Sequence, residues 1–154
     1  MPDAPTPGSG AGRTRAAVDA WEAVFRLQAV LLRRFTADDV WGGLSLREYD
    51  VLYTLSRHPS HRLRLVELSE EVYLPQPSLS RLVDRLARDG LVAREADPDD
   101  GRGVVVVLTA TGSARQREIG GRHAVGIARN LAGLTEAELA ELTRLADKAL
   151  TADA

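Results

Sequence analysis

The fold is decided by residues 76–108, which read QPSLSRLVDRLARDGLVAREADPDDGRGVVVVL. In the first half of this stretch, apolar residues recur at i, i+3, i+4 and i+7, which is the spacing of one buried face of an α-helix. They are Leu79, Leu82, Val83 and Leu86. Pro77 suits the first helical position, where an amide hydrogen is dispensable, and Gly90 suits the C-terminal cap. The pattern therefore predicts an amphipathic helix from Pro77 to the Gly90 cap.

The second half of the stretch has the period of strands rather than of a helix. Residues 91–96 and the β-branched run 104–108 read as two strands. Residues 97–103 between them contain the Pro, Asp and Gly that favour turns. A β-hairpin is therefore predicted directly after the amphipathic helix.

A longer helix is predicted upstream. Residues 45–48, Ser-Leu-Arg-Glu, have the spacing of a capping box, so this helix should begin at Leu46. It should end near His58, because Pro59 disfavours helical geometry in the residue before it. Its buried stripe is expected to be Leu46, Tyr49, Leu52 and Tyr53.

A second, shorter helix lies between that helix and the decisive stretch. Residues 63–65 favour a brief strand, and residues 66–73 favour two helical turns with Leu68 and Val72 facing inward. A short helix, a turn, an amphipathic helix and a hairpin, in this order, define a winged helix-turn-helix. Residues 45–108 are therefore expected to form one winged-helix lobe.

Helices are also predicted on both flanks of this lobe. Residues 1–12, rich in Pro, Gly and Ala, read as a disordered tail, and a helix follows from about Arg13 to Phe35. Its apolar stripe is Val18, Trp21, Phe25, Leu32 and Phe35. The chain is thus predicted to be mainly α with one small β-hairpin.

Two helices are expected after the hairpin. Thr109 can cap a helix over residues 110–131, in which Gly120 and Gly121 indicate a kink or a close helix contact. Residues 135–138, Thr-Glu-Ala-Glu, form a second capping box that opens the last helix. The apolar face of that helix is Leu139, Leu142, Leu145, Ala146 and Ala149.

Composition excludes several classes of protein. A chain of 154 residues with 44% hydrophobic content favours a single domain. The absence of cysteine excludes disulfides, thiolate zinc sites and cysteine catalysis, and it suits a reducing cytoplasm. No signal peptide and no apolar run of roughly 18 residues is present, so a soluble cytoplasmic protein is expected. Without a phosphate-binding glycine loop, a His-Glu-x-x-His motif or a nucleophile elbow, neither an enzyme nor a cofactor is predicted.

The polar side of the amphipathic helix carries the chemistry of base recognition. Glutamine pairs with adenine, arginine with the O6 and N7 atoms of guanine, and serine with bases or phosphates. The predicted DNA-binding residues on this helix are Gln76, Ser78, Ser80, Arg81, Arg85 and Arg88. Arg85 is equally suited to a bracing ion pair. At the hairpin tip, Arg102 lies between two glycines that allow a tight turn, so it can reach an adjacent minor groove.

The chain resembles the MarR (multiple antibiotic resistance regulator) family of bacterial transcription factors. The likeness runs from about Arg13 to Leu150, and its most specific parts are LSRLVDRL at 79–86, GLV at 90–92, residues 97–108 and TATG at 109–112. It implies one domain over residues 13–152. In that domain, residues 13–36 and 110–152 form dimerisation helices beside the winged-helix lobe.

The resemblance also implies a function and further residue roles. A homodimer would set two recognition helices in successive major grooves of a pseudo-palindromic operator, with repression as the default output. Arg102 would be the wing arginine, and Asp99 or Asp100 would brace the wing. Many members of the family release DNA on binding a small aromatic or phenolic effector.

A pocket for such an effector can be drawn from aromatic residues of the flanking and upstream helices. Its predicted residues are Trp21, Phe25, Arg26, Tyr49 and Tyr53, with Trp41 and Arg47 as further candidates. Aromatic residues at helical spacing are also ordinary core residues, so the pocket hypothesis competes with plain packing.

The charge of the winged-helix lobe leaves a second function open. Residues 61–102 hold seven arginines against nine acids, so the reading head is acidic overall, and a dimeric interaction module that does not bind DNA is the competing function. His58, His61 and His123 could in principle bind a metal ion, but the first two look like an exposed loop, and no metal site is predicted.

Overall fold

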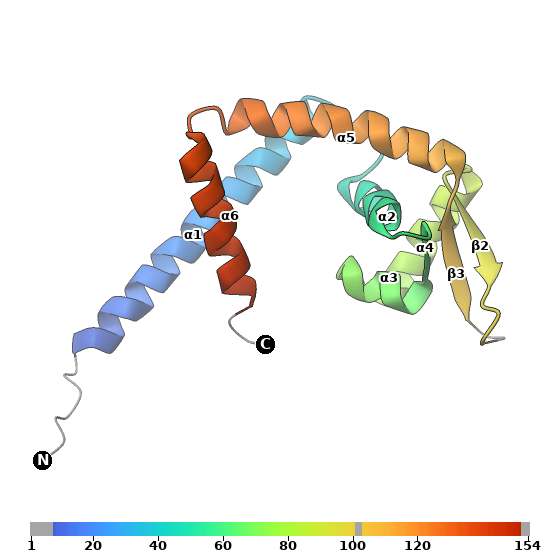
Figure 1. Cartoon of the computed structure of the whole chain (residues 1–154), viewed down its shortest axis with the longest axis horizontal. Helices are drawn as coiled ribbons and strands as arrows, with labels where there is room; N and C mark the ends of the chain where they lie inside the picture. Colours follow the sequence, from blue (N-terminus) through green and yellow to red (C-terminus); the bar gives the residue numbers. More distant parts are fainter. Residues whose placement is uncertain (1–7, 101–102, 152–154) are drawn as a thin grey trace, which may run out of the picture. The chain divides into compact units, whose positions relative to one another are not determined.

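The computed structural model describes residues 8–100 and 103–151 (Figure 1). Its helices are α1 (Gly8–Ala37), α2 (Leu46–Arg57), α3 (Leu65–Glu71), α4 (Gln76–Arg88), α5 (Ala110–Asn130) and α6 (Glu136–Leu150). Its strands are β1 (Arg62–Arg64), β2 (Val92–Ala96) and β3 (Val104–Leu108). The chain divides into two compact units, one up to Asp38 and one from Asp39 onward.

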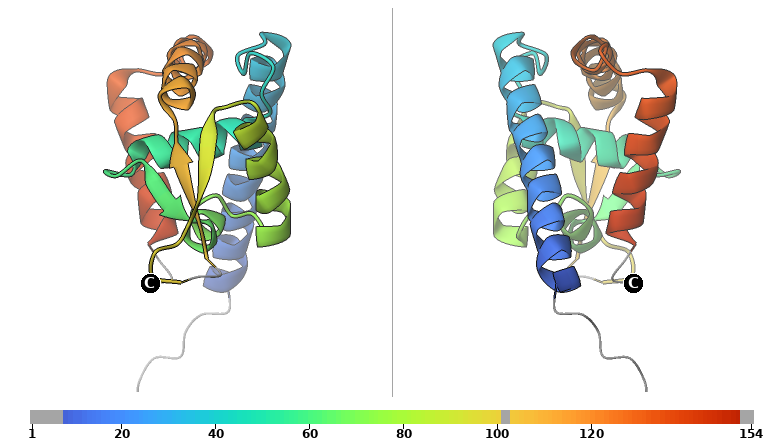
Figure 2. Two further views of the ribbon diagram at one scale, coloured as in Figure 1. Left: turned by 90° about the vertical axis from the view of Figure 1, so that its right-hand side faces the viewer. Right: turned by 90° about the vertical axis from the view of Figure 1, so that its left-hand side faces the viewer.

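The prediction of a mainly helical winged fold is confirmed, with one addition. β1 joins the hairpin as a third strand, so the antiparallel sheet has the order β1-β3-β2 (Figure 2). The register pairs Arg62 with Val107 and Val92 with Leu108. The turn between β2 and β3 therefore lies at the end of the hairpin that is farthest from α5 (Figure 1).

The core of the second unit lies beneath α4. The predicted stripe of this helix is buried throughout, since Leu79, Leu82, Val83 and Leu86 all belong to one apolar cluster. The cluster also contains Leu52 of α2 and other residues of α2, α3 and the sheet. Burying a side chain of this size stabilises a fold by about 1.5–3 kcal/mol, so the four residues anchor α4 firmly.

The end of α4 is closed by a Schellman motif. Gly90 has φ +71°, a left-handed conformation that glycine adopts without steric cost. Its amide donates to the Ala87 carbonyl at 3.0 Å, and the Leu91 amide donates to the Leu86 carbonyl at 2.9 Å. The motif turns the chain directly from α4 into β2, as the Gly90 prediction required.

The junction between β3 and α5 is a single residue, Thr109. Its hydroxyl lies 2.7 Å from the Gly90 carbonyl and accepts the Gly112 amide at 2.9 Å, which caps α5. A Cβ at Gly112 would overlap the Leu91 carbonyl, so only glycine allows this close approach. The close contact was predicted at Gly120 and Gly121. Gly120 does lie near the Tyr49 hydroxyl, but Gly121 faces open space.

Other local predictions need correction. In α2 the inward residues include Val51 and Leu55, both fully buried, whereas Tyr53 is 45% exposed. The predicted stripe was therefore rotated by part of a turn. α4 begins at Gln76, so Pro77 is its second residue, and α1 begins at Gly8, so residues 8–12 of the predicted tail are helical.

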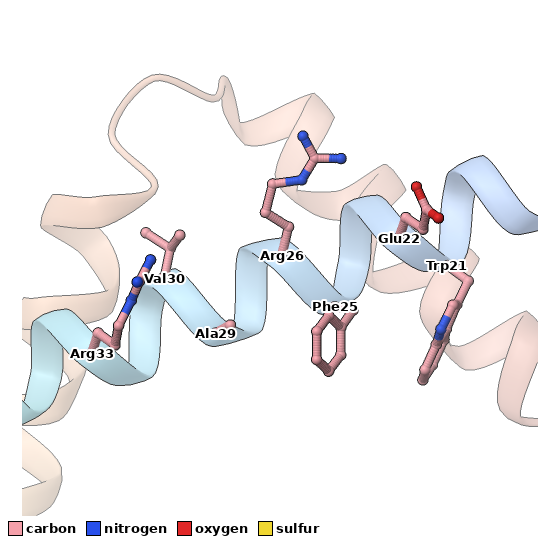
Figure 3. A pocket seen from close by; sticks show the side chains of 7 residues that line it. All are labelled: Trp21, Glu22, Phe25, Arg26, Ala29, Val30 and Arg33. Carbon is pink, nitrogen blue, oxygen red and sulfur yellow. The ribbon is translucent and has the colours of Figure 1, made fainter.

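The apolar faces of α1 and α6 are not covered in the single chain. On α1, Trp21 is 66% exposed, and Trp21 and Phe25 point to the same side of the helix (Figure 3). Their rings are 6.3 Å apart. On α6 none of the residues is buried, and Leu145 is 49% exposed.

Candidate nucleic-acid interface

The outward face of α4 is exposed, apart from ion pairs that Arg85 and Asp84 make with α2 and β2. Gln76, Ser78, Arg81, Arg85 and Arg88 are all exposed. Arg81, Arg85 and Arg88 lie on the side of the helix opposite its buried stripe, while Gln76 and Ser78 are exposed at its N-terminal tip. The helix is thus held by one face and presents the other. This is the geometry that a recognition helix needs in order to enter a major groove.

Arg81 and Arg88 have no acidic partner among the described residues. The Nε of Arg81 donates to the Pro77 carbonyl at 3.3 Å, and the Nε of Arg88 donates to the Asp84 carbonyl at 3.3 Å. Both contacts are with the backbone of α4 itself. The charges of these two guanidinium groups are therefore not neutralised in the free protein.

Arg85 is differently placed, because its Nε donates to a carboxylate oxygen of Glu48 on α2 at 3.1 Å. Burial alone would raise the pKa of Glu48, but hydrogen bonds from Ser45 and the pairing with Arg85 hold this pKa below its ordinary value. In the free chain, Arg85 therefore serves as a brace between α4 and α2.

A second ion pair joins the hairpin to α4. Arg94 of β2 donates to the Asp84 carboxylate and lies 3.4 Å from the Ser80 hydroxyl. Ser80, a predicted DNA-binding residue, is only partly exposed and faces the wing rather than standing free. The contact fixes the hairpin against the recognition helix.

The other side of the sheet carries a ladder of opposite charges. Arg62 of β1 pairs with Glu95 of β2 at 2.7 Å, across the central strand. Arg64 pairs with Asp97 at 2.7 Å and with Asp99 at 3.1 Å. Acids at every second position of β2 and the following turn thus pair with arginines at every second position of β1.

Asp97 is the brace that sequence reasoning missed. It is the one charged residue found buried in the described part of the chain, and its carboxylate accepts the Asp99 amide at 3.0 Å. Its own amide donates to the Gly103 carbonyl at 3.1 Å. Asp99, a predicted brace, shares this network, while Asp100 accepts the Gly103 amide at 2.8 Å through its backbone carbonyl. The sequence did carry a signal for this network: residues 62 and 64 are arginines and residues 95 and 97 are acids, each set spaced by two as on one face of a strand.

These ion pairs neutralise part of the acidic charge of residues 61–102. Among the acids of the reading head, Asp84, Glu95, Asp97 and Asp99 are paired with arginine. A fifth, Glu67, accepts the Arg64 amide at 2.9 Å. The arginines without acidic partners in the described part of residues 61–102 are Arg81 and Arg88, and both lie on the outward face of α4. Arg102 lies outside the described residues.

The residues predicted to line an effector pocket fall into two sets. Trp21, Phe25 and Arg26 line a shallow hollow along α1 (Figure 3). Tyr49 and Tyr53 belong to α2, with ring centroids 6.0 Å apart. Their role in binding an effector stays a prediction.

An aromatic cluster formed by α2, α5 and the loop before α2 contains a histidine. The His123 ring lies 4.8 Å from Trp41 and 5.8 Å from Tyr49, measured between centroids. Burial lowers the pKa of His123, although the nearby Asp50 acts in the opposite direction. Burial also raises the pKa of Asp50 itself.

The three histidines do not converge. The His58 ring lies 2.9 Å from the Ser60 hydroxyl, far along the chain from His123. Within residues 8–100 and 103–151, no three His, Cys, Asp or Glu side chains gather as metal ligands would. No helix in the described part of the chain has the length and apolar content of a membrane span.

The fold and this outward face define a winged helix-turn-helix protein. The family model described as "MarR family" matches residues 42–103. The HTH-type transcriptional repressor Rv2887 of Mycobacterium tuberculosis is 30% identical over 125 residues, which cover 81% of this chain and 88% of the relative. The chain belongs to the MarR family, as the resemblance predicted. The family and these relatives are transcription regulators.

Two similar solved structures were obtained with bound partners. Sco3205, a MarR family transcriptional regulator from Streptomyces coelicolor, was solved in complex with DNA. It is 28% identical, with a TM-score of 0.68 over 98% of this chain and 92% of that one. The PcaV transcriptional regulator of the same organism, in complex with its natural ligand, is 25% identical, with a TM-score of 0.62 over 100% of both chains.

Proposed function

We propose that this chain is a homodimeric repressor that binds a pseudo-palindromic operator in double-stranded DNA in the cytoplasm. The observation that carries the proposal is the outward face of α4. Asp84 and Glu48 near this face are paired with Arg94 and Arg85, while Arg81 and Arg88 are exposed without acidic partners among the described residues. The complex of Sco3205 with DNA supports the same use of this fold.

Each predicted DNA-binding residue of α4 has a proposed task. Gln76 and Ser78 lie in the first turn and contact base edges, and Arg81, one turn later, reads a guanine. Arg88 lies near the C-terminal end and contacts phosphate. Arg102 would enter the minor groove beside the hairpin. Arg85 and Ser80 have to leave Glu48 and Arg94 before they can contact DNA.

The uncovered helices support the proposed dimer. Trp21 and Phe25 on α1, Val125 on α5 and Leu145 on α6 leave large apolar surfaces in contact with water. Faces of this kind on several helices are typical of a surface that is buried against another subunit. A second copy of the chain would cover them and present two α4 helices to one DNA duplex.

Release of DNA by a small aromatic effector is the proposed control. The ligand complex of PcaV supports it, and this chain offers Trp41, Tyr49 and His123 in contact with one another. If an effector binds near this cluster, saturating ligand should quench the Trp41 fluorescence and weaken operator binding. A Trp41→Phe variant, in which only Trp21 reports, separates this signal from binding elsewhere.

The DNA proposal is tested by recovering bound fragments from genomic DNA and then titrating them by fluorescence anisotropy. The Arg81→Ala variant should lose about 1–3 kcal/mol of discrimination at one base pair of each half-site. The Arg88→Ala variant should weaken binding evenly across sequences and reduce the slope of log K against log salt by about 1.

Arg57→Ala is the matched control, because Arg57 is an exposed arginine at the end of α2. It should bind like the parent. If the parent protein forms no complex with any fragment at low salt, the DNA proposal is wrong and the interaction module becomes the better hypothesis.

A further inference from the structure

The tip of α4 exposes apolar surface that the polar contacts with DNA proposed above do not explain. Pro75 is the N-cap and Pro77 the second helical residue, and both are exposed on either side of Gln76. In the adjoining turn, Tyr73 is 88% exposed and has a left-handed φ of +52°. A bulky residue in that conformation is strained, so the fold does not favour this tyrosine.

The same prolines reduce the ability of the helix end to bind phosphate. Helix N-termini bind anions through free backbone amides, but Pro75 and Pro77 have none. The Ser78 and Leu79 amides donate to the Pro75 carbonyl at 2.9 and 3.0 Å. In the first turn of α4, as the structure describes it, only the Gln76 amide is without an acceptor. The tip therefore has few amides with which to bind a phosphate, and most of its exposed surface is hydrocarbon.

In the major groove, one feature of a base pair calls for hydrocarbon. Thymine presents its C5-methyl group there, next to the oxygen atom of the same base, and its partner adenine presents the atoms that a glutamine amide can pair with. A glutamine between two proline rings thus matches an A·T pair with a neighbouring thymine. No other base carries a methyl group in unmodified DNA.

We propose that the rings of Pro75 and Pro77 read thymine C5-methyl groups, so that each half-site carries a thymine beside the adenine that Gln76 reads. This inference rests on the proposed function, because it assumes that α4 enters the major groove. It assigns base preference at the tip of the helix to shape and hydrophobic contact, with Arg81 supplying the polar preference one turn later.

The test uses the recovered operator with single thymines of one half-site replaced in turn by deoxyuridine, which lacks only the methyl group. At one or two positions the loss should weaken binding of the parent protein about fourfold, the effect of burying one such group. Replacement by 5-bromodeoxyuridine, whose bromine is close to a methyl group in size, should restore affinity at these positions.

The variants locate the effect. Pro77→Ser should bind the thymine and deoxyuridine duplexes equally, and Pro75→Ser, which places a favourable N-cap residue, provides the same test if Pro77→Ser fails to fold. Pro59→Ser is the control, because Pro59 is exposed in the loop before β1, at the end of the sheet away from the 97–103 turn. It should keep the discrimination of the parent.

The outcomes separate the two proposals. If the parent binds the operator tightly but no deoxyuridine changes its affinity, or if Pro77→Ser and Pro75→Ser both keep the discrimination, the methyl proposal is wrong while the DNA proposal stands. If no duplex is bound at all, the DNA proposal itself fails.

Discussion

Helices α4 and α6 are amphipathic helices of similar length, 13 and 15 residues, with opposite environments. Four apolar residues of α4 are buried in the single chain, and none of α6 is. The sequence pattern is of the same kind in both. The difference shows that α4 packs within the winged-helix lobe, whereas the apolar face of α6 is left exposed, as the proposed dimer requires.

The largest effect is expected from a cavity beneath α4, which tests whether this helix packs within the lobe. Leu86 is fully buried, so Leu86→Ala should reduce the free energy of unfolding by about 2–5 kcal/mol. The loss should not depend on protein concentration, because the packing lies within one chain. Urea denaturation at two protein concentrations measures it, and a loss below about 1 kcal/mol would contradict the burial described for α4.

The next test compares two positions of α5, the helix that follows the lobe. Gly112→Ala forces a Cβ against the Leu91 carbonyl and should cost about 1–3 kcal/mol. Gly121→Ala, in open space within the same helix, should instead stabilise the chain by about 0.5–1 kcal/mol, since alanine favours helices. Thermal unfolding of both variants decides the matter. Equal effects would contradict the close approach at Gly112.

A charge on α6 tests the other side of the comparison. Leu145→Arg should weaken the proposed dimer at least tenfold, about 1.4 kcal/mol, because it places a charge in an apolar interface. Analytical ultracentrifugation measures the dissociation constant. Arg144→Ala is the control, since Arg144 pairs at 2.7 Å with Glu141 of its own helix. A monomeric parent protein would overturn the dimer proposal directly.

The smallest expected effect concerns Glu48, whose pKa is lowered first by hydrogen bonds from Ser45 and then by the ion pair with Arg85 that joins α2 to α4. The pKa of Glu48 in the folded chain lies below the ordinary value of 4.5, so the stabilisation is complete above pH 4.5 and is lost as pH falls through the lower, folded value. Its size should be about 1 kcal/mol or less, because Arg85 is half exposed. Glu48→Gln, which keeps a capping residue, should lack this acid slope in urea denaturation between about pH 3 and 6.

The predicted elements were those that local pattern determines. The stripe of α4 and the Gly90 cap follow from spacing within one helix, and both are confirmed. Tyr53 was misplaced because a short amphipathic pattern allows the stripe to rotate, and packing against the rest of the lobe chose Val51 and Leu55 instead. Local periodicity cannot make that choice.

The site was less predictable, because its contacts join residues far apart in sequence. Arg64 and Asp97 are 33 residues apart, and only the registers of β1 and of β2 on the central strand β3 bring them together. The contact of Arg94 with α4 was not predicted, because a strand residue shows no helical spacing. By contrast, Arg81 and Arg88 could be placed on the outward face of α4 from their spacing along the sequence relative to Leu82 and Leu86.

The single residue between β3 and α5 has a mechanical consequence. Thr109 is hydrogen-bonded to the end of α4 and to the first turn of α5, so no flexible linker separates β3 from the long helix. At about 3.3 Å per residue, the five residues of β3 place its first residue, Val104, about 17 Å from Thr109, so a tilt of about 10° passed from α5 to β3 would move that end of the strand by about 3 Å. A displacement of that size is enough to withdraw a side chain from a groove.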